Sequence, residues 1–360
     1  MGDKIKKMDV SVAAKQPQWL EKPVRISEQK WPEGTQPVVS IFCITYNHEK
    51  FIRDAIEGFL MQETTFPVQI FIHDDASTDH TADIIKEYAE KYPSLFWTVL
   101  QTENQYSKTG FRFFFEHIRK QAGVFTALCE GDDFWIDPSK LQKQVKVLKK
   151  RVDCPASFHR CLVKELETGK SEIWPPKEKY LHEDTVGYKQ ILEKYLFHTS
   201  TMLIRSDVIK ALPRTANQAG VGDIIMQLYP LQYGPWIFCE GIMSTFRRFP
   251  QSNFFHWDQR LLISALEIAR KLDTGKSGKK LIKKKLTEEY YKTSIWRRSY
   301  NDPKEARRFF LKAILGDPFL LIKKYGFFNV LKQGFAAMLN LGQKHSYASF
   351  SKFKAKKQQS

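Results

Sequence analysis

Short apolar stretches alternate with amphipathic stretches through the first half of the chain. The apolar runs cover residues 38–47, 68–78, 95–104 and 124–130. Between them, apolar side chains recur at the three-to-four-residue spacing that places them on one face of a helix. Near-continuous apolar strands separated by helices predict an α/β fold with a parallel sheet covered on both faces. In such sheets, ligands bind beyond the carboxyl ends of the strands.

Acidic side chains gather where two of these predicted strands end. Asp74 and Asp75 lie in the second run, and Glu130, Asp132 and Asp133 follow the fourth. Like charges this close repel one another, and each costs free energy if it leaves water unpaired. Turns and helix caps explain a single Asp well, but they explain two acids directly before two large aromatic residues poorly. We therefore expect both groups to meet at one edge of the sheet, around a cation or a polar ligand.

The charge of the chain changes in its last third. Of 57 Lys and Arg and 40 Asp and Glu in all, residues 258–360 hold 24 basic and 8 acidic side chains. Apolar side chains in this segment recur at helical spacing. We predict an irregular leader over residues 1–36, a globular domain over 37–257, and a basic amphipathic helical extension over 258–360.

The basic charge of the extension has three candidate explanations. An apolar stripe with lysines nearby suits a helix lying on an anionic membrane surface. The stripe is Phe327, Leu331, Phe335 and Met338, and the lysines are Lys323, Lys324, Lys332 and Lys344. The alternative is that the helices pack on the domain and their lysines face water. Nucleic acid is not expected, because no zinc finger or RNA-recognition signature accompanies the charge.

The protein is expected in the cytoplasm, either free or peripheral on the inner face of the cell membrane. No secretory signal opens the chain, and the longest uncharged stretch is too short to span a bilayer. The five cysteines form no CxxC pair, so buried thiols in a reducing compartment are expected and zinc is not.

A series of motifs resembles the inverting family 2 glycosyltransferases with the GT-A fold. In chain order they read CITYNHEKFI, HDDASTD, CEGDDFW, DPSKLQKQV, FHTSTMLIRSDVI and GVGDIIMQLYPLQYG, and the resemblance covers roughly residues 37–256. It implies a Rossmann-like nucleotide-binding sheet with mixed strands, flanked by helices. It also implies a metal-dependent hexosyltransferase that moves a sugar from a nucleotide-diphosphate donor, of UDP type, to a glycan or lipid-linked acceptor. The context implied is the synthesis of surface polysaccharide or cell-wall glycan.

The resemblance assigns roles position by position. Asp132 is expected to hold Mg²⁺ or Mn²⁺ on the diphosphate, and Asp223 occupies the place of the catalytic base. Glu130, Asp133 and Trp135 are expected at the donor sugar or just behind it. The nucleotide pocket is expected to contain Thr45, Tyr46, Asn47, Glu49, Asp74 and Asp132.

The chain departs from the family pattern at two positions. Gly222 precedes Asp223 where the family usually has Glu, and Phe249 stands where a histidine is common. The basic group on the diphosphate is therefore open, with Arg247 and Arg248 as candidates, and His198 is a candidate acceptor contact. The processive motif Gln-x-x-Arg-Trp is missing, so one sugar per encounter is expected. The alternative functions are a sugar nucleotidyltransferase and a non-catalytic basic protein that binds membrane or glycan.

Overall fold

The computed structural model describes residues 19–338, except 111, 122, 178–180, 182, 195–196, 219–221, 251–258, 273–274 and 301. The chain divides into two units, Met1–Gly278 and Lys279–Ser360. The predicted boundary after residue 257 lies outside the described residues, as do the first half of the predicted leader and residues 339–360.

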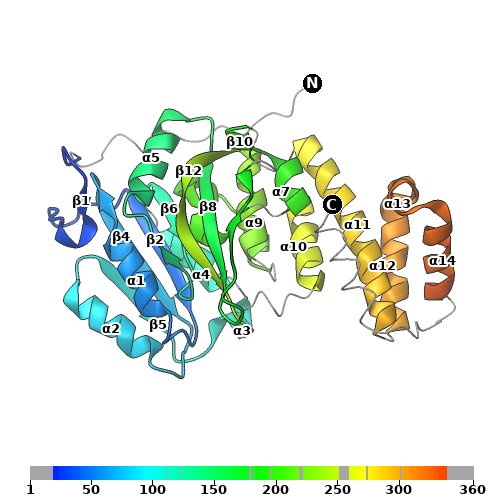
Figure 1. The fold of residues 1–360 in the computed structure, drawn as a ribbon, viewed down its shortest axis with the longest axis horizontal. Helices are drawn as coiled ribbons and strands as arrows, with labels where there is room; N and C mark the ends of the chain where they lie inside the picture. Colours follow the sequence, from blue (N-terminus) through cyan, green and yellow to red (C-terminus); the bar gives the residue numbers. More distant parts are fainter. Residues whose placement is uncertain are drawn as a thin grey trace. The chain divides into compact units, whose positions relative to one another are not determined.

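Four parallel strands form one half of a ten-stranded sheet in the first unit (Figure 1). In spatial order they are β6 (Phe125–Leu128), β2 (Val39–Thr45), β4 (Val68–Asp74) and β5 (Phe96–Leu100). These are the four predicted strands. The second and third runs extend past their strands, because the Asp, Ser, Thr and Asn residues that follow form turns instead of continuing the ladder.

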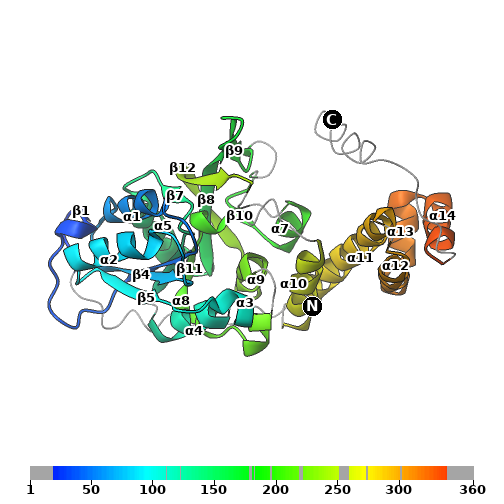
Figure 2. The ribbon, with the colours of Figure 1, turned by 90° about the horizontal axis from the view of Figure 1, so that it is seen from below.

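Helices cover both faces of this half, as predicted. Figure 2 shows α1 and α2 on one face of the sheet and α4 on the other. The helix α1 turns Ile52, Ala55, Ile56 and Phe59 into the core, where each is fully buried. The bounds of the helices in this half are α1 (Ile52–Leu60), α2 (Thr81–Lys91), α3 (Gln105–Thr109), α4 (Arg112–Gln121) and α5 (Lys140–Lys150).

The other half of the sheet contains antiparallel pairs, so the sheet is mixed. The strand β11 (Leu203–Arg205) runs antiparallel to β6 and to β8 (Ala156–Glu165). The long strand β12 (Trp236–Arg248) runs parallel to β8 and antiparallel to β7 (Phe134–Trp135). At the margins, β10 (Thr185–Val186) pairs with β12, and β9 (Ser171–Trp174) pairs with β8. The β7–β12 pairing joins the acidic segment to the end of β12.

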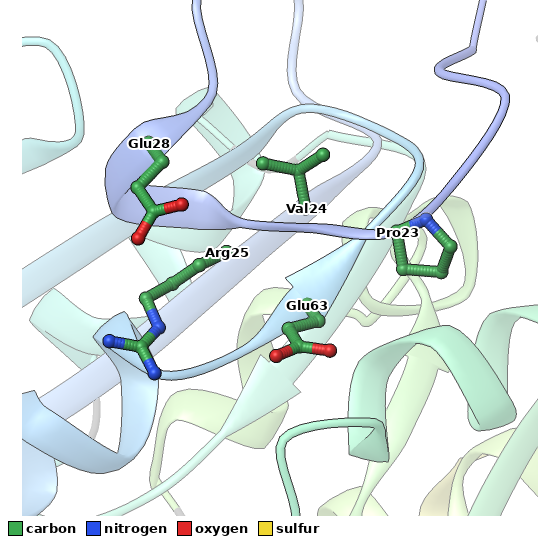
Figure 3. A pocket seen from close by; sticks show the side chains of 5 residues that line it. All are labelled: Pro23, Val24, Arg25, Glu28 and Glu63. Carbon is green, nitrogen blue, oxygen red and sulfur yellow. The ribbon is translucent and has the colours of Figure 1, made fainter.

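A small second sheet pairs β1 (Val24–Arg25) with β3 (Glu63–Thr64). The short 3-10 helix η2 (Ile26–Glu28) follows β1, and Ile26 is fully buried. An open hollow lies here, lined by Pro23, Val24, Arg25, Glu28 and Glu63 (Figure 3). None of these residues belongs to the predicted site, and the hollow is separate from it.

Further helices complete the described part of the chain. In the first unit they are α7 (Tyr188–Lys194), α8 (Ser206–Lys210), α9 (Gly222–Leu228) and α10 (Gln259–Lys271), with the 3-10 turns η3 (Thr199–Thr201), η4 (Arg214–Gln218) and η5 (Pro230–Gln232). After α11 (Gly275–Ser299) come α12 (Pro303–Gly316), α13 (Pro318–Tyr325) and α14 (Phe327–Met338). The carboxylates of Asp302 and Asp317 cap α12 and α13, each followed by a first-turn proline. Where the chain is described, none of its helices is both long and apolar enough to cross a bilayer.

Candidate active site

The acidic segment Glu130–Asp133 is held tightly at the carboxyl edge of the parallel strands. The amide of Gly131 donates to the carbonyl of Ile44 in β2, 2.9 Å away, and Cys129 donates to Phe42. On the other side, the β7–β12 pairing places Phe134 opposite Thr245. The segment is therefore fixed between two strands rather than carried on a free loop.

Gly131 is needed here because of its small size. A Cβ added at residue 131 would lie 2.6 Å from the hydroxyl oxygen of Thr45 and 2.7 Å from its Cβ. We expect Gly131→Ala to push the acidic segment away from β2, lowering the free energy of unfolding by about 1–3 kcal/mol and reducing turnover. Chemical denaturation and initial rates measure both effects.

Gly187→Ala is the matched control for Gly131→Ala, because an added Cβ would have only Gln190 Oε1 nearby, at 3.8 Å. It should change stability by a few tenths of a kcal/mol. Equal losses in the two variants would contradict the close-packing argument.

Three side chains, two from the acidic segment and one from the start of η3, place ligand atoms close together. Oxygen atoms of Glu130 and Asp133 and a ring nitrogen of His198 all lie within 4.8 Å of one another. His198 Nδ1 is 3.3 Å from Asp133 Oδ2, and its ring stacks on Phe246 with centroids 4.0 Å apart. The hydroxyl of Thr199 donates to Glu130. Carboxylate oxygens together with a neutral imidazole are a donor set that binds divalent cations.

Burial and mutual repulsion shift the pKa values of the groups in this cluster. Burial, opposed by the Thr199 hydrogen bond and reinforced by the charges of Asp132 and Asp223, raises the pKa of Glu130 to about 7. Burial, followed by the charges of Asp132 and Glu130, raises the pKa of Asp133 well above its usual range. Burial also lowers the pKa of His198 to about 3, so its ring is neutral at physiological pH. A bound cation would relieve the repulsion among the acids.

Asp132 is not part of this trio and lies beside His48, which is in the segment between β2 and α1. Its Oδ2 lies 3.8 Å from His48 Nε2, and its side chain keeps 18% of its surface exposed. The backbone carbonyl of Asp132 accepts a hydrogen bond from the guanidinium of Arg247. The expectation that Asp132 holds the metal stays a prediction, and the grouping of ligand atoms in the structure favours its neighbours Glu130 and Asp133.

Arg247 forms hydrogen bonds with other groups of the protein. Its amide donates to Asp133, 2.8 Å away, and its guanidinium bonds the Asp132 carbonyl and the Asp54 carboxylate. Phe134 lies under the guanidinium, 4.2 Å from ring centroid to Cζ. Arg247 therefore braces the acidic segment with two of its five guanidinium donors, and its place on the diphosphate stays a prediction. Arg248, the other candidate, lies near exposed Glu172, with 3.3 Å between Nη1 and Oε1.

The end of β4 carries two acids with different surroundings. The buried carboxylate of Asp74 accepts hydrogen bonds from the amide and hydroxyl of Ser77, and burial raises its pKa. The carboxylate of Asp75 accepts from the amides of Gln105 and Tyr106, 2.6 and 3.0 Å away, and so holds the start of α3. Asp74 thus lies at the expected edge, where its role with a nucleotide stays a prediction.

The residues after β2 and β4 are bonded to one another. Asn47 has φ +56°, a left-handed conformation that asparagine tolerates, and its side chain accepts from the amide of Thr78 at 2.8 Å. Glu49 accepts from the amide of His80. Thr45 is buried with its hydroxyl lacking a partner among the described residues, and Tyr46 is 45% exposed.

Asp223 lies in the first turn of α9, where its carboxylate accepts from the amide of Ile224 at 2.7 Å. Burial raises its pKa to about 6. Its charge also raises the pKa values of Glu130 and of Tyr106 on α3, so it lies within electrostatic range of both. The candidate base is therefore within electrostatic range of the acidic segment, although the two are about ninety residues apart in sequence.

Trp135 lies in the core rather than facing the site. Its ring is 1% exposed, packs edge-on against Phe59 and donates to the carbonyl of Ser200. The amine of Lys140 lies 4.0 Å from the ring centroid. With the side chain this deeply buried, the geometry gives no support to a stacking role under the donor sugar.

Several residues of the site lacked a clear sequence signal. His48 beside Asp132 and Thr199 beside Glu130 lie within the motifs, and their proximity to candidate residues was the available clue. Asp54, the partner of Arg247, lies on α1 without any motif. Only the three-dimensional pairing of distant strands brings it to Arg247.

Comparison with known proteins agrees with this arrangement. Residues 40–212 match the family described as glycosyl transferase family 2. The uncharacterized protein Rv1520 of Mycobacterium tuberculosis is 44% identical over 138 residues, which are 38% of this chain and 39% of that protein. TuaG of Bacillus subtilis, whose name places it in teichuronic acid biosynthesis, is 27% identical over 173 residues, 47% of this chain and 62% of TuaG. The matched stretch thus spans less than two thirds of either relative.

The likeness of the fold extends further along the chain. The crystal structure of S. aureus TarS 1-349 in complex with UDP-GlcNAc has a TM-score of 0.58 to this chain at 13% identity, covering 85% of this chain and 93% of that one. Identity this low establishes the shared fold alone. Taken with the family match, the mixed sheet and the acidic carboxyl edge, it follows that residues 40–212 form a glycosyl transferase family 2 domain with the GT-A fold.

Proposed function

We propose that the protein is a metal-dependent inverting glycosyltransferase that moves a single sugar from a nucleotide-diphosphate donor to a glycan or lipid-linked acceptor. The observation that carries the proposal is the meeting of Glu130, Asp133 and His198 within range of Asp223, at the carboxyl edge of a family 2 domain. TuaG supports a place in the synthesis of a surface polysaccharide, and the ligand of TarS supports a UDP-type donor.

The residues present fit a hard divalent cation. Glu130, Asp133 and His198 would hold Mg²⁺ or Mn²⁺, with Asp132 adjacent. When bound, the ion would neutralise charge on the departing diphosphate. The protein's own residues prepare the site: Arg247 and Thr199 fix the acids, and the Phe246 ring and the Ser200 amide hold the neutral ring of His198.

Asp223 has the properties that a general base requires in this reaction. An acceptor hydroxyl that loses its proton during attack on the anomeric carbon becomes a better nucleophile. A carboxylate with a raised pKa takes a proton more readily than an ordinary one, and attack from the acceptor side in one displacement inverts the anomeric configuration.

A panel of nucleotide sugars tests the proposal. Purified protein with Mn²⁺ and glycan or lipid-linked acceptors should release nucleoside diphosphate from one class of donor, and the product should have the anomeric configuration opposite to that of the donor. A retained configuration would contradict the single displacement, and nucleotide transfer onto a sugar phosphate would indicate a nucleotidyltransferase instead.

The pH profile of the reaction follows from the pKa of Asp223. The base must be unprotonated to accept the acceptor proton, and burial raises its pKa to about 6. We expect kcat/KM to fall by up to about tenfold per pH unit below about pH 6 and to level off above it, with Glu130 and Tyr106 as the titratable neighbours of Asp223. A profile that is flat through pH 6, measured with saturating metal, would contradict the assignment.

A further inference from the structure

The apolar stripes of the C-terminal helices differ in how well they are covered. On α10, Leu262, Ala265 and Leu266 are buried, and on α12 Phe309 and Phe310 are buried. The apolar sides of α10 and α12 are therefore covered by protein, as expected if the helices pack rather than bind a membrane. The apolar stripe on α14 is exposed instead.

The helix α14 exposes large apolar side chains on one side. At 100° per residue, Phe327, Phe328, Leu331 and Phe335 fall within an arc of about 100°. Their exposed fractions are 52%, 84%, 42% and 66% in the same order. We refer to these four residues as the α14 face.

The adjoining side of α14 accounts for its packing. Val330 and Ala337 are buried, and a Cβ added at Gly334 would lie 2.8 Å from the ring of Phe310 on α12. The helix is thus already docked on its small residues, and the α14 face is not needed to hold it there. Packing of α14 on its neighbouring helix therefore does not explain why these large apolar side chains lie at the surface.

The exposure is local. Every exposed phenylalanine among the described residues lies between Phe319 and Phe335. A contiguous apolar patch on a surface marks a site of interaction, whereas scattered exposed residues do not. From residue 279 to residue 338 the sequence also holds 15 Lys and Arg against 5 Asp and Glu.

The basic charge around the α14 face favours a lipid surface over a second copy of the chain as its partner. Exposed Lys332 lies beside the α14 face on the helix, and exposed Lys323 lies on α13. A second copy would bring two strongly basic units together, which repel one another. An anionic lipid surface offers both an apolar layer for aromatic side chains and phosphate groups for lysines.

We propose that the α14 face binds the surface of an anionic lipid bilayer, with its three phenylalanines and Leu331 entering the interface between headgroups and acyl chains. Lysines beside the face contact the phosphates. This inference stands independently of the transferase reaction, because it rests on residues outside the family 2 domain. If both hold, the membrane would bring the protein to a lipid-linked acceptor.

Vesicle sedimentation of the full chain tests the proposal. The protein should bind vesicles of phosphatidylcholine with phosphatidylglycerol, and bind phosphatidylcholine alone at least about tenfold more weakly. Phe328→Ser/Phe335→Ser should weaken binding to the anionic vesicles by about tenfold or more, because two aromatic anchors are lost. The double variant Val152→Ser/Leu166→Ser, at two exposed apolar residues of the first unit, should bind like wild type.

The other outcomes overturn the proposal. Wild type that does not sediment with anionic vesicles excludes a membrane site, as does a face variant that binds as tightly as wild type while unfolding at the same temperature. Sedimentation velocity without lipid shows whether copies associate. If the face variant converts a dimer to a monomer while vesicle binding is unchanged, the α14 face is an interface between copies.

Discussion

Replacing Asp223 by asparagine is expected to lower the turnover number by about 10²–10⁴-fold, the usual contribution of a general base. Asparagine keeps the size of the side chain and its oxygen can still accept the Ile224 amide, so α9 should begin as before. Donor binding should persist, because Asp223 contributes no ligand atom to the trio of Glu130, Asp133 and His198. Steady-state rates and donor titration in the presence of Mn²⁺ separate the two effects.

Asp207→Asn is the matched control. Asp207 also lies in the first turn of a short helix, and its carboxylate accepts from the next amide at 2.9 Å, as that of Asp223 does at 2.7 Å. A general effect of removing an acid from a helix start would reduce turnover in both variants. Unchanged turnover in Asp223→Asn, with the control also active, would remove Asp223 from the mechanism.

Replacing Arg247 by methionine should have the largest effect on stability. The change removes the hydrogen bonds to the Asp132 carbonyl and the Asp54 carboxylate and the stacking on Phe134, while the backbone bond to Asp133 remains. Because Asp54 is about half exposed, we expect a loss of about 2–4 kcal/mol in the free energy of unfolding rather than the full cost of breaking a buried ion pair.

Arg248→Met distinguishes bracing from diphosphate binding. Arg248 pairs with an exposed glutamate, so its loss should cost less than about 1 kcal/mol of stability. If Arg248 contacts the diphosphate, its variant will be stable but have a raised KM for donor. If Arg247→Met instead stays as stable as wild type and loses donor affinity, Arg247 is a diphosphate ligand and not a brace.

The parallel half of the fold was predictable because its strands are buried on both faces. A strand such as β2 is apolar throughout, and its polar successors mark the edge at which ligands bind. That logic placed Asp74 and the acidic segment at the same edge. The motif resemblance, rather than any local pattern, pointed to Asp223.

Contacts between distant parts of the chain were not predictable. Arg247 and Asp132 are 115 residues apart, and only the β7–β12 register brings them together. Strand alternation carried an unused signal: when Phe134 faces Arg247, its neighbour Trp135 must face the opposite side, into the core. Exposure of the α14 face likewise depends on which side of the helix Gly334 docks.

Metal-dependent nucleotide binding tests the central claim most directly, because the acidic segment is proposed to hold a divalent cation on a diphosphate. Thermal unfolding would be followed with nucleoside diphosphates, with Mn²⁺ or with EDTA, for wild type and for Glu130→Gln/Asp133→Asn. Asp83→Asn, on the exposed side of α2, serves as control. The account predicts that at least one nucleoside diphosphate raises the unfolding temperature of wild type and of the control only with Mn²⁺, and that the acid variant loses this response. A response that is equal in EDTA, or that survives in the acid variant, would contradict it.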